Sequence, residues 1–372
     1  MSRMRLAVVG TGHLGRIHAR IAAGLEDAQL VAVVDSNAVA REQVAADTGA
    51  KPLADYRELL GNVDGAIIAT PTSSHAAVAN DLLRGGIPLL VEKPITATLA
   101  EAEEMVALAD RQQLVLQVGH VERFNPALVS VSSKLEDPKY IEARRLSGYT
   151  FRSTDVGVVM DLMIHDIDVV LSLVRSELVG VEAFGFSVLG GQEDMVNARL
   201  RFASGCIANL TASRVSHTPE RSMQVITSEC CADIDFGSRR TSIVEPTDDV
   251  LSREFDVDAL SVEQKDHFRE HLFDELLVKR ELPALETNAI EQEQLDFCTA
   301  IRTGGSPQVT GADGRDAVAI AERVLEQVEQ HQWDGAQTGR HGAFALPMLP
   351  TVLSEPDSWS EEDTVVIRRK AG

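Results

Sequence analysis

The sequence predicts an α/β protein in two parts: a doubly wound parallel sheet, followed by an α+β part with a large, mostly antiparallel open sheet. The chain has 372 residues, which exceeds one ordinary core of about 100–200 residues. From residue 5 to residue 118, short runs of Val, Ile and Leu alternate with stretches of helical length. After about residue 140, polar and apolar residues alternate instead. The first pattern is typical of buried parallel strands with crossover helices, and the second of antiparallel strands with one exposed face.

The N-terminal part is expected to contain strands that are buried on both faces of the sheet. These strands are predicted at Arg5–Val9, Leu30–Val34, Gly65–Ala69, Pro88–Val91 and Val115–Val118. The crossover helices are predicted at Leu14–Leu25, Ala38–Thr48, Ser74–Arg84 and Leu99–Arg111. Thr98 and Glu101 form a capping-box pattern, which marks the start of the last of these helices.

The C-terminal part shows strand patterns followed by two helical ones. Asn197–Phe202 and Cys206–Thr211 alternate in polarity, and the Ala-Ser-Gly segment between them predicts a hairpin. Further strands are expected at Val181–Leu189, Ser222–Thr227 and Ala232–Phe236, and helices at Asn288–Arg302 and Gly314–Gln332. We therefore expect one domain over residues 1–122, a second over residues 123–335 and a C-terminal tail over residues 336–372.

Charge and composition exclude several classes of partner. A formal net charge of −22 repels nucleic acid and anionic membrane surfaces. None of the four cysteines forms a C-x-x-C pair or lies beside a histidine at metal-ligand spacing, so we expect no metal site and a reducing, cytoplasmic location. No apolar run approaches the roughly 18 residues of a membrane span, and the N-terminal run is shorter than a signal-peptide core.

A glycine-rich turn follows the first predicted strand. Gly10, Gly12 and Gly15 form the pattern G-x-G-x-x-G at the start of a helix, where main-chain amides can face a diphosphate. Asp35 ends the second strand about 20 residues later, where its carboxylate can accept hydrogen bonds from an adenosine ribose. The pattern predicts a Rossmann domain that binds NAD. NADP is the weaker alternative, because Asp35 would repel a 2′-phosphate, although Arg41 is close by.

The segment Glu92-Lys93-Pro94 closes the fourth predicted strand, at the edge of the sheet where doubly wound folds bind ligands. Proline keeps Lys93 out of helical geometry, so its ammonium would lie on a turn. There it can hydrogen-bond a substrate hydroxyl and favour its alkoxide. The alternative is an ordinary exposed lysine at a strand end.

Residues 157–168 predict a largely apolar helix with Asp161 and His165 on the same face. A histidine, with an ordinary pKa of about 6.5, can accept a hydroxyl proton at neutral pH. Asp161 could hold the imidazole or bind a neighbouring hydroxyl. The alternative is a histidine paired with an aspartate in a packed helix. Asp166 and Asp168 are expected at the helix surface or as caps.

Together these motifs resemble the glucose-fructose oxidoreductase, inositol dehydrogenase and rhizopine-catabolism (Gfo/Idh/MocA) family over roughly residues 4–333. The Gly10–Gly12 turn, Ala69-Thr70-Pro71 with His75, Glu92-Lys93-Pro94 and the Asp161–His165 helix follow the family's order. The resemblance implies Lys93, Asp161 and His165 as catalytic residues, with His165 as general base. It implies a cofactor site formed by Gly10, Gly12, His13, Leu14, Gly15, Asp35, Thr70, Pro71, His75, Glu92, Lys93 and His120.

One segment departs from the family pattern. Many members carry an asparagine after the fifth strand, whereas this chain reads Gly-His-Val-Glu-Arg-Phe-Asn-Pro from Gly119. This spelling is similar to the branch that includes UDP-N-acetylglucosamine 3-dehydrogenases. A nucleotide-sugar substrate would need positive groups, and Arg123, Arg152 and Arg214 are candidates for its phosphate or carboxylate. Each is equally typical of a surface or ion-pair arginine.

The predicted reaction is the oxidation of a secondary hydroxyl on a sugar or nucleotide sugar, with hydride passing to NAD. Two alternatives stay open at this point. The chain could be a cofactor-sensing protein without turnover, or it could reduce a non-sugar carbonyl with the same fold. The open face of the second sheet would suit a homodimer or homotetramer.

Overall fold

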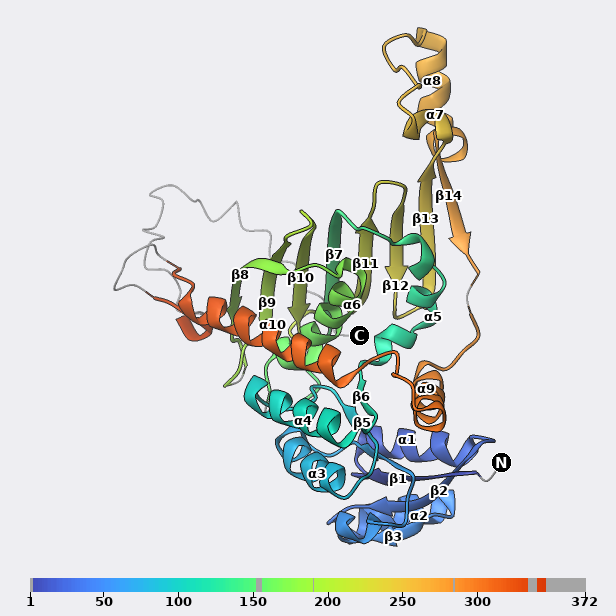
Figure 1. Ribbon diagram of the computed structural model, residues 1–372. Helices are drawn as coiled ribbons and strands as arrows, with labels where there is room; N and C mark the ends of the chain where they lie inside the picture. Colours follow the sequence, from blue (N-terminus) through green and yellow to red (C-terminus); the bar gives the residue numbers. More distant parts are fainter. Residues whose placement is uncertain (1–2, 152–155, 190, 284, 334–339, 346–372) are drawn as a thin grey trace, which may run out of the picture.

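The computed structural model describes residues 3–151, 156–189, 191–283, 285–333 and 340–345. Helices pack against both of its sheets. Three of them, α4 (Leu99–Gln112), α9 (Ala289–Thr303) and α10 (Gly311–Gln330), lie between the two sheets (Figure 1). The predicted α/β class, with a parallel sheet followed by a mostly antiparallel one, is confirmed.

The first sheet is parallel throughout and has the strand order β3-β2-β1-β4-β5-β6. Its strands are β1 (Met4–Val9), β2 (Ala28–Val34), β3 (Lys51–Leu53), β4 (Gly65–Ile68), β5 (Leu89–Glu92) and β6 (Leu116–Gly119). Only β3 was not predicted. It is a three-residue edge strand with a central proline, and such a strand carries almost no periodic signal. Glu92 consequently ends the fifth strand, not the fourth.

Helices connect these strands at the predicted places. They are α1 (His13–Gly24), α2 (Ala38–Thr48), the 3-10 turn η1 (Tyr56–Leu59), α3 (Thr72–Arg84) and α4 (Leu99–Gln112). Thr98 and Glu101 cap each other's main-chain amides, so the predicted capping box at the start of α4 is present. The order β3-β2-β1-β4-β5-β6 brings the ends of β1 and β4 together, and this is the switch point where doubly wound sheets bind ligands.

The second sheet has the order β14-β13-β12-β11-β7-β10-β9-β8 and is antiparallel except for the pair β7 and β10. Its strands are β7 (Tyr140–Leu146), β8 (Leu178–Phe186), β9 (Met195–Phe202), β10 (Ile207–Ser213), β11 (Glu220–Ile226), β12 (Cys231–Asp235), β13 (Arg240–Pro246) and β14 (Leu277–Leu282). The predicted hairpin is the pair β9 and β10. Strands β7, β13 and β14 were not predicted, because their charged residues obscure the alternation.

The helical elements of the second part are η2 (Val121–Phe124), α5 (Pro126–Val129), η3 (Ser132–Lys134), the π-helix η4 (Val159–Met163), α6 (Ile164–Val174), α7 (Asp248–Leu251), α8 (Val262–His271), the π-helix η5 (Leu272–Leu276), α9 (Ala289–Thr303), α10 (Gly311–Gln330) and η6 (Ala343–Ala345). Helices α6 and α10 cover one face of the second sheet, and α10 also reaches the first part (Figure 1). There the amide of Leu99 donates to the Glu322 carboxylate at 2.8 Å.

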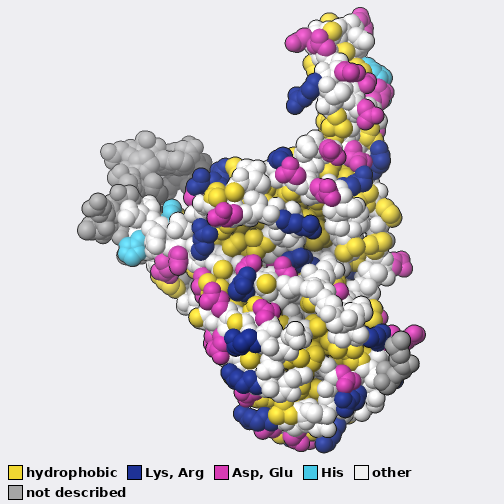
Figure 2. Space-filling model, in the orientation of Figure 1, with side chains coloured by type: hydrophobic (Ala, Val, Ile, Leu, Met, Phe, Trp, Pro, Cys, Tyr) yellow, Lys and Arg dark blue, Asp and Glu magenta, His cyan; other side chains and the backbone are white. Residues whose placement is uncertain are grey.

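Helices α7 and α8 project beyond β13 and β14, away from both sheets (Figure 1). Neither helix contains a buried residue. On the face shown in Figure 2, acidic and basic side chains are interspersed over the body, and acidic ones are frequent on this projection. Within the described ranges, no helix is long and apolar enough to cross a bilayer.

Candidate active site

Two cavities lie side by side where the carboxyl edge of the first sheet meets the π-helical turn η4. Their volumes are about 290 and 280 Å³. They share the residues Leu14, Glu92, Lys93 and Asp161. The loop after β4, with Thr70, Pro71 and His75, lines the first cavity, whereas His165 and Arg221 line the second. The structure therefore places Lys93, Asp161 and His165 at one cavity, although they are far apart in the sequence.

The glycine turn after β1 is as tight as its sequence predicts. Gly10 has a φ of +96°, and a Cβ there would lie 2.5 Å from the carbonyl oxygen of Ala69. A Cβ at Gly15 would lie 1.9 Å from the carbonyl oxygen of Gly10. A Cβ at Gly12, in contrast, would meet nothing within 4 Å. Gly10 and Gly15 are thus required by the turn itself, and Gly12 leaves free space at the N-terminus of α1.

This free space fits the diphosphate of a dinucleotide. Gly12 is the N-cap of α1 and provides no side-chain hydrogen bond, so the first amides of the helix stay available to an anion. The next residues, His13 and Leu14, are exposed, and Leu14 borders both cavities. Gly12, His13 and Leu14 are thus open to a ligand at the N-terminus of α1.

Asp35 is held rigidly beside the glycine turn. Its carboxylate accepts hydrogen bonds from the amide and the hydroxyl of Thr11 at 2.7 and 2.8 Å, and from the amide of Asn37 at 2.8 Å. Partial burial opposes ionisation, but these hydrogen bonds lower the pKa of Asp35 overall. Arg41 donates to the main-chain carbonyls of Asp35 and Ser36. A fixed anion at this place favours a ribose with free hydroxyls over a 2′-phosphate.

The loop after β4 is tied to the loop after β5 through His75. This buried imidazole has Nδ1 at 3.0 Å from the carbonyl of Pro94 and Nε2 at 2.9 Å from the carbonyl of Thr70. The Thr70 hydroxyl is buried without a partner, and so are both ring nitrogens of His120. Burial lowers the pKa of His120, which favours the neutral ring. Unpartnered polar atoms beside the cavities are groups that a bound nicotinamide could satisfy.

Glu92, at the end of β5, borders both cavities and is held by hydrogen bonds. Its carboxylate accepts a hydrogen bond from the Lys93 amide and contacts Nε2 of His18 at 2.6 Å. Burial would raise the pKa of Glu92, but the hydrogen bond from His18 and the charges of His18 and Lys93 lower it. His18 was not predicted to belong to this site.

Glu293 completes a buried cluster with His18 and Glu92. The nearest donor atoms of the three lie within 4.8 Å of one another, a grouping that could in principle hold a metal ion. However, Nε2 of Gln294 donates to the His18 carbonyl at 3.2 Å and lies 3.0 Å from Nδ1 of His18. Both ring nitrogens of His18 therefore already have protein partners, Gln294 at Nδ1 and Glu92 at Nε2, so neither is left for a metal ion.

The Lys93 ammonium connects the first sheet to the second part of the chain. It donates to the main-chain carbonyl of Asp161 at 2.7 Å and to the Asp161 carboxylate at 3.0 Å. Asp161 lies in the π-helix η4 and not in a regular α-helix, which begins only at Ile164. Of the two roles considered for Asp161, holding the imidazole is not observed, because its carboxylate pairs with Lys93 instead.

His165 lines the cavity without a hydrogen-bond partner. Its Nδ1 is buried and unpartnered, and no described residue hydrogen-bonds its Nε2, whose surface is not fully buried. Burial lowers the pKa of His165 well below its ordinary value, and the charges of Lys93 and Arg145 lower it further. At neutral pH the ring is thus unprotonated and has a lone pair available to a proton donor in the cavity.

The three arginines predicted to bind the substrate have different surroundings. Arg123 donates twice to the buried Asp168, at 2.8 and 3.0 Å. Arg214 pairs with the buried Asp194 at 2.6 Å and donates to the Val156 carbonyl. The alternative interpretation as ion-pair arginines thus describes both. Arg152 lies outside the described residues.

Two arginines that the sequence analysis did not single out line the second cavity instead. Arg145 is buried between Asp166 and Glu122, with contacts of 2.7 and 2.8 Å. Asp166 and Asp168 were expected at the helix surface or as caps. This expectation is wrong, because both are buried partners of arginines. Arg221, the second arginine that lines this cavity, is exposed. Strand β7 was the signal that could have identified them, because its register with β11 places Arg145 directly opposite Arg221.

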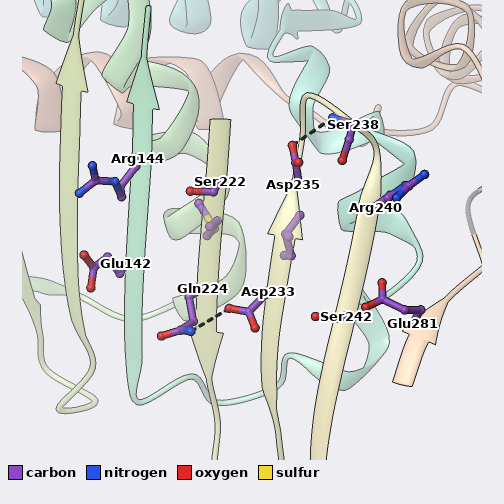
Figure 3. Close-up of a pocket in the computed structure, with 12 residues that line it drawn as sticks. Glu142, Arg144, Ser222, Gln224, Asp233, Asp235, Ser238, Arg240, Ser242 and Glu281 are labelled. Carbon is purple, nitrogen blue, oxygen red and sulfur yellow. Dashed lines mark hydrogen bonds between the residues drawn. The ribbon is translucent and has the colours of Figure 1, made fainter. Parts of the chain in front are cut away.

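A larger hollow, of about 730 Å³, lies on the open face of the second sheet (Figure 3). Its side chains come from β7 and β11–β14 and include Glu142, Arg144 and Asp233. Figure 3 shows Gln224 and Asp233 hydrogen-bonded across neighbouring strands. The hollow contains no histidine and none of the glycine turn, so the chemistry described above belongs to the two smaller cavities.

Comparisons with known proteins cover both parts of the chain. A family model described as "Oxidoreductase family, NAD-binding Rossmann fold" matches residues 4–120, and the corresponding C-terminal domain model matches residues 127–232. A UDP-N-acetylglucosamine 3-dehydrogenase of Acidithiobacillus ferrooxidans is 40% identical over 237 residues, which cover 63% of this chain and 75% of that protein. An inositol 2-dehydrogenase of Rhizobium meliloti is 26% identical over 346 residues, covering 88% and 97%.

Solved structures agree with these matches. The structure of the UDP-N-acetylglucosamine 3-dehydrogenase from Acidithiobacillus ferrooxidans superposes with a TM-score of 0.77 at 33% identity, covering 88% of this chain and 99% of that one. A levoglucosan dehydrogenase in complex with NADH superposes with a TM-score of 0.74 at 19% identity, covering 88% and 97%, which shows the same fold. This chain therefore belongs to the Gfo/Idh/MocA family of NAD-binding oxidoreductases, as its motifs predicted.

Proposed function

We propose that the protein oxidises a secondary hydroxyl group of a sugar or nucleotide sugar, with His165 as the general base. The observation that carries this proposal is the meeting of Lys93, Asp161 and His165 at one cavity beside the glycine turn. When bound, NAD⁺ supplies the acceptor for the hydride that leaves the carbinol carbon. The glycine turn, Asp35, Thr70, Pro71, His75, Glu92 and His120 are the residues that we expect to hold it.

The chain's own residues supply the proton chemistry. Neutral His165 accepts the hydroxyl proton, and its lowered pKa keeps the ring in the base form at neutral pH. The Lys93 ammonium donates a hydrogen bond to the same oxygen and stabilises its developing negative charge. Asp161 orients this ammonium through the contact of 3.0 Å. Oxidation releases one proton and leaves a carbonyl on the sugar.

For the substrate, we propose UDP-N-acetylglucosamine, oxidised at C3. The support is the relative of that name, which is 40% identical and of which this chain covers 75%. The alternatives are inositols and free sugars, because family members with those substrates share the fold.

The test measures formation of reduced cofactor with NAD⁺ and with NADP⁺, using UDP-N-acetylglucosamine, free N-acetylglucosamine, myo-inositol and glucose. His165→Ala should lower turnover by about 100- to 10,000-fold while NADH affinity, measured by fluorescence, changes little. His267→Ala is the matched control, because His267 is exposed on the projecting helix α8. A fully active His165→Ala variant would show that His165 is not the base. If the wild-type protein oxidises none of these substrates, the proposed reaction is overturned.

A further inference from the structure

Arg221 differs from the other arginines near the cavity in the surroundings of its guanidinium. Arg145 is held by Asp166 and Glu122, Arg123 by Asp168, and Arg214 by Asp194. Among the residues that the structure describes, none forms an ion pair or a side-chain hydrogen bond with the Arg221 guanidinium. The chain has a net charge of −22 and therefore many carboxylates with which an arginine could pair. The described part of the fold nevertheless places none of them against the Arg221 guanidinium.

The register of the second sheet determines where Arg221 points. Arg221 in β11 lies opposite Arg145 in β7, and directly opposite residues have their side chains on the same face. That face is the one covered by α6, because Arg145 reaches Asp166 there. The neighbouring pair, Arg144 and Ser222, lies on the open face (Figure 3). Arg221 is therefore on the cavity side of the sheet.

Arg221 lies where the second cavity meets solvent. It lines the same cavity of about 280 Å³ as Lys93, Asp161 and His165. Arg145, deeper in the cavity wall, is only 4% exposed, whereas Arg221 is exposed. A substrate whose hydroxyl contacts His165 would thus extend its other end past Arg221.

We infer that Arg221 binds an anionic group of the substrate and so makes the enzyme selective for anionic sugars over neutral ones. This inference rests on the proposed oxidation and specifies its substrate class. A guanidinium presents its donors in a fork that matches a phosphate or a carboxylate. The anion is the diphosphate of a nucleotide sugar or the carboxylate of a sugar acid, and the two are separated by experiment.

The first measurement is equilibrium binding by calorimetry, with UDP, inorganic pyrophosphate and glucuronate as probes of the NADH-loaded protein. Arg221→Gln should weaken the binding of at least one anion by about ten- to hundredfold. Arg221→Lys should lose less, because it keeps the charge without the fork. Arg240→Gln is the matched control, since Arg240 is exposed on the same sheet but at the open-face hollow. Loss of UDP and pyrophosphate binding identifies a phosphate site, and loss of glucuronate binding alone identifies a carboxylate site.

The second measurement is the ratio of kcat/KM for UDP-N-acetylglucosamine to kcat/KM for free N-acetylglucosamine. Arg221→Gln should lower this ratio by about tenfold or more, and rising salt should lower it in the wild type. Equal anion binding by Arg221→Gln and the wild type, or an equal loss in Arg240→Gln, would overturn the inference. Binding needs no turnover, so it separates this outcome from failure of the proposed oxidation.

Discussion

Lys93 and Asp161 are 68 positions apart in the sequence, and their side chains form an ion pair of 3.0 Å at the centre of the candidate active site. Lys93 directly follows β5, and Asp161 lies in the π-helix η4. Because the same ammonium also binds the Asp161 main-chain carbonyl, the contact fixes η4 against the edge of the first sheet. One pair thus positions the proposed oxyanion donor and joins the two parts of the chain.

Replacing Lys93 by Met should remove the donor while keeping a side chain of similar length. We expect kcat to fall by about 100- to 1,000-fold, the usual loss for one donor to a developing oxyanion. Single-turnover absorbance of reduced cofactor measures this step. Asp161→Asn, which keeps a hydrogen-bond acceptor for the ammonium, should lose less activity than Lys93→Met. The opposite order would assign the main role to the carboxylate.

The pH profile should show the lowered pKa of His165. Burial and the charges of Lys93 and Arg145 favour the neutral ring, so the base form persists below the ordinary pKa of about 6.5. The acid limb of kcat/KM for oxidation is therefore expected below pH 6.5. Arg221→Gln removes one of the nearby positive charges and should move this limb upward. A limb above pH 6.5 in the wild type would contradict the proposed environment of the base.

Glu293 should make stability depend on pH. It is fully buried, both of its carboxylate oxygens lack partners, and burial together with the charge of Glu92 raises its pKa well above the usual value. The folded protein therefore keeps a proton that the unfolded chain releases near pH 4.3. Stability from this group is present at low pH and is lost as pH rises through the raised pKa.

Glu293→Gln replaces the group by a neutral side chain of the same shape. Its thermal unfolding midpoint should exceed that of the wild type, and the difference should grow as the pH is raised from about 4.3. Glu291→Gln, at an exposed position of the same helix, should show no such trend. A wild-type midpoint that stays above that of Glu293→Gln at every pH would mean that the carboxylate is ionised and partnered in the folded protein.

The glycine turn offers a matched pair of substitutions. Gly10→Ala places a Cβ at 2.5 Å from the Ala69 carbonyl oxygen on a backbone with φ of +96°, so it should destabilise the fold by at least about 1–3 kcal/mol. Gly12→Ala meets nothing within 4 Å and should leave the unfolding midpoint unchanged. It should nevertheless weaken NADH binding, since its methyl group enters the space assigned to the diphosphate. Equal NADH binding by Gly12→Ala and the wild type would place the diphosphate elsewhere.

Arg123 provides a contrast to Arg221. Arg123→Gln leaves the buried Asp168 without its partner, and breaking a buried pair costs about 3–5 kcal/mol. We therefore expect a lower midpoint of chemical unfolding for Arg123→Gln and an unchanged one for Arg221→Gln. If Arg123→Gln instead keeps wild-type stability and loses anion binding, the original assignment of Arg123 to the substrate would be restored.

The sequence by itself determined the features that depend on local order along the chain. The period of the apolar residues gave the alternating strands and helices of the first sheet, and Gly10, Gly12, Gly15 and Asp35 predicted the NAD site because each acts within its own strand-to-helix turn. Short or charged strands were not predicted: β3 is an edge strand with a central proline, and β7 alternates charged with apolar residues. In both, the neighbouring strand and not the local pattern stabilises the extended conformation.

The tertiary structure alone decided which charges meet. The sequence could name Lys93, Asp161 and His165, but the pairing of Asp161 with Lys93 in place of His165 depends on how η4 packs against β5. It could equally name Arg123 and Arg214 but not their buried partners, Asp168 and Asp194. Ion pairs form between groups that packing brings within about 4 Å, and sequence separation carries no information about that distance. The same holds for two arginines on one face of the sheet: Arg145 meets Asp166 and Glu122, whereas Arg221, directly opposite it, meets no carboxylate among the described residues.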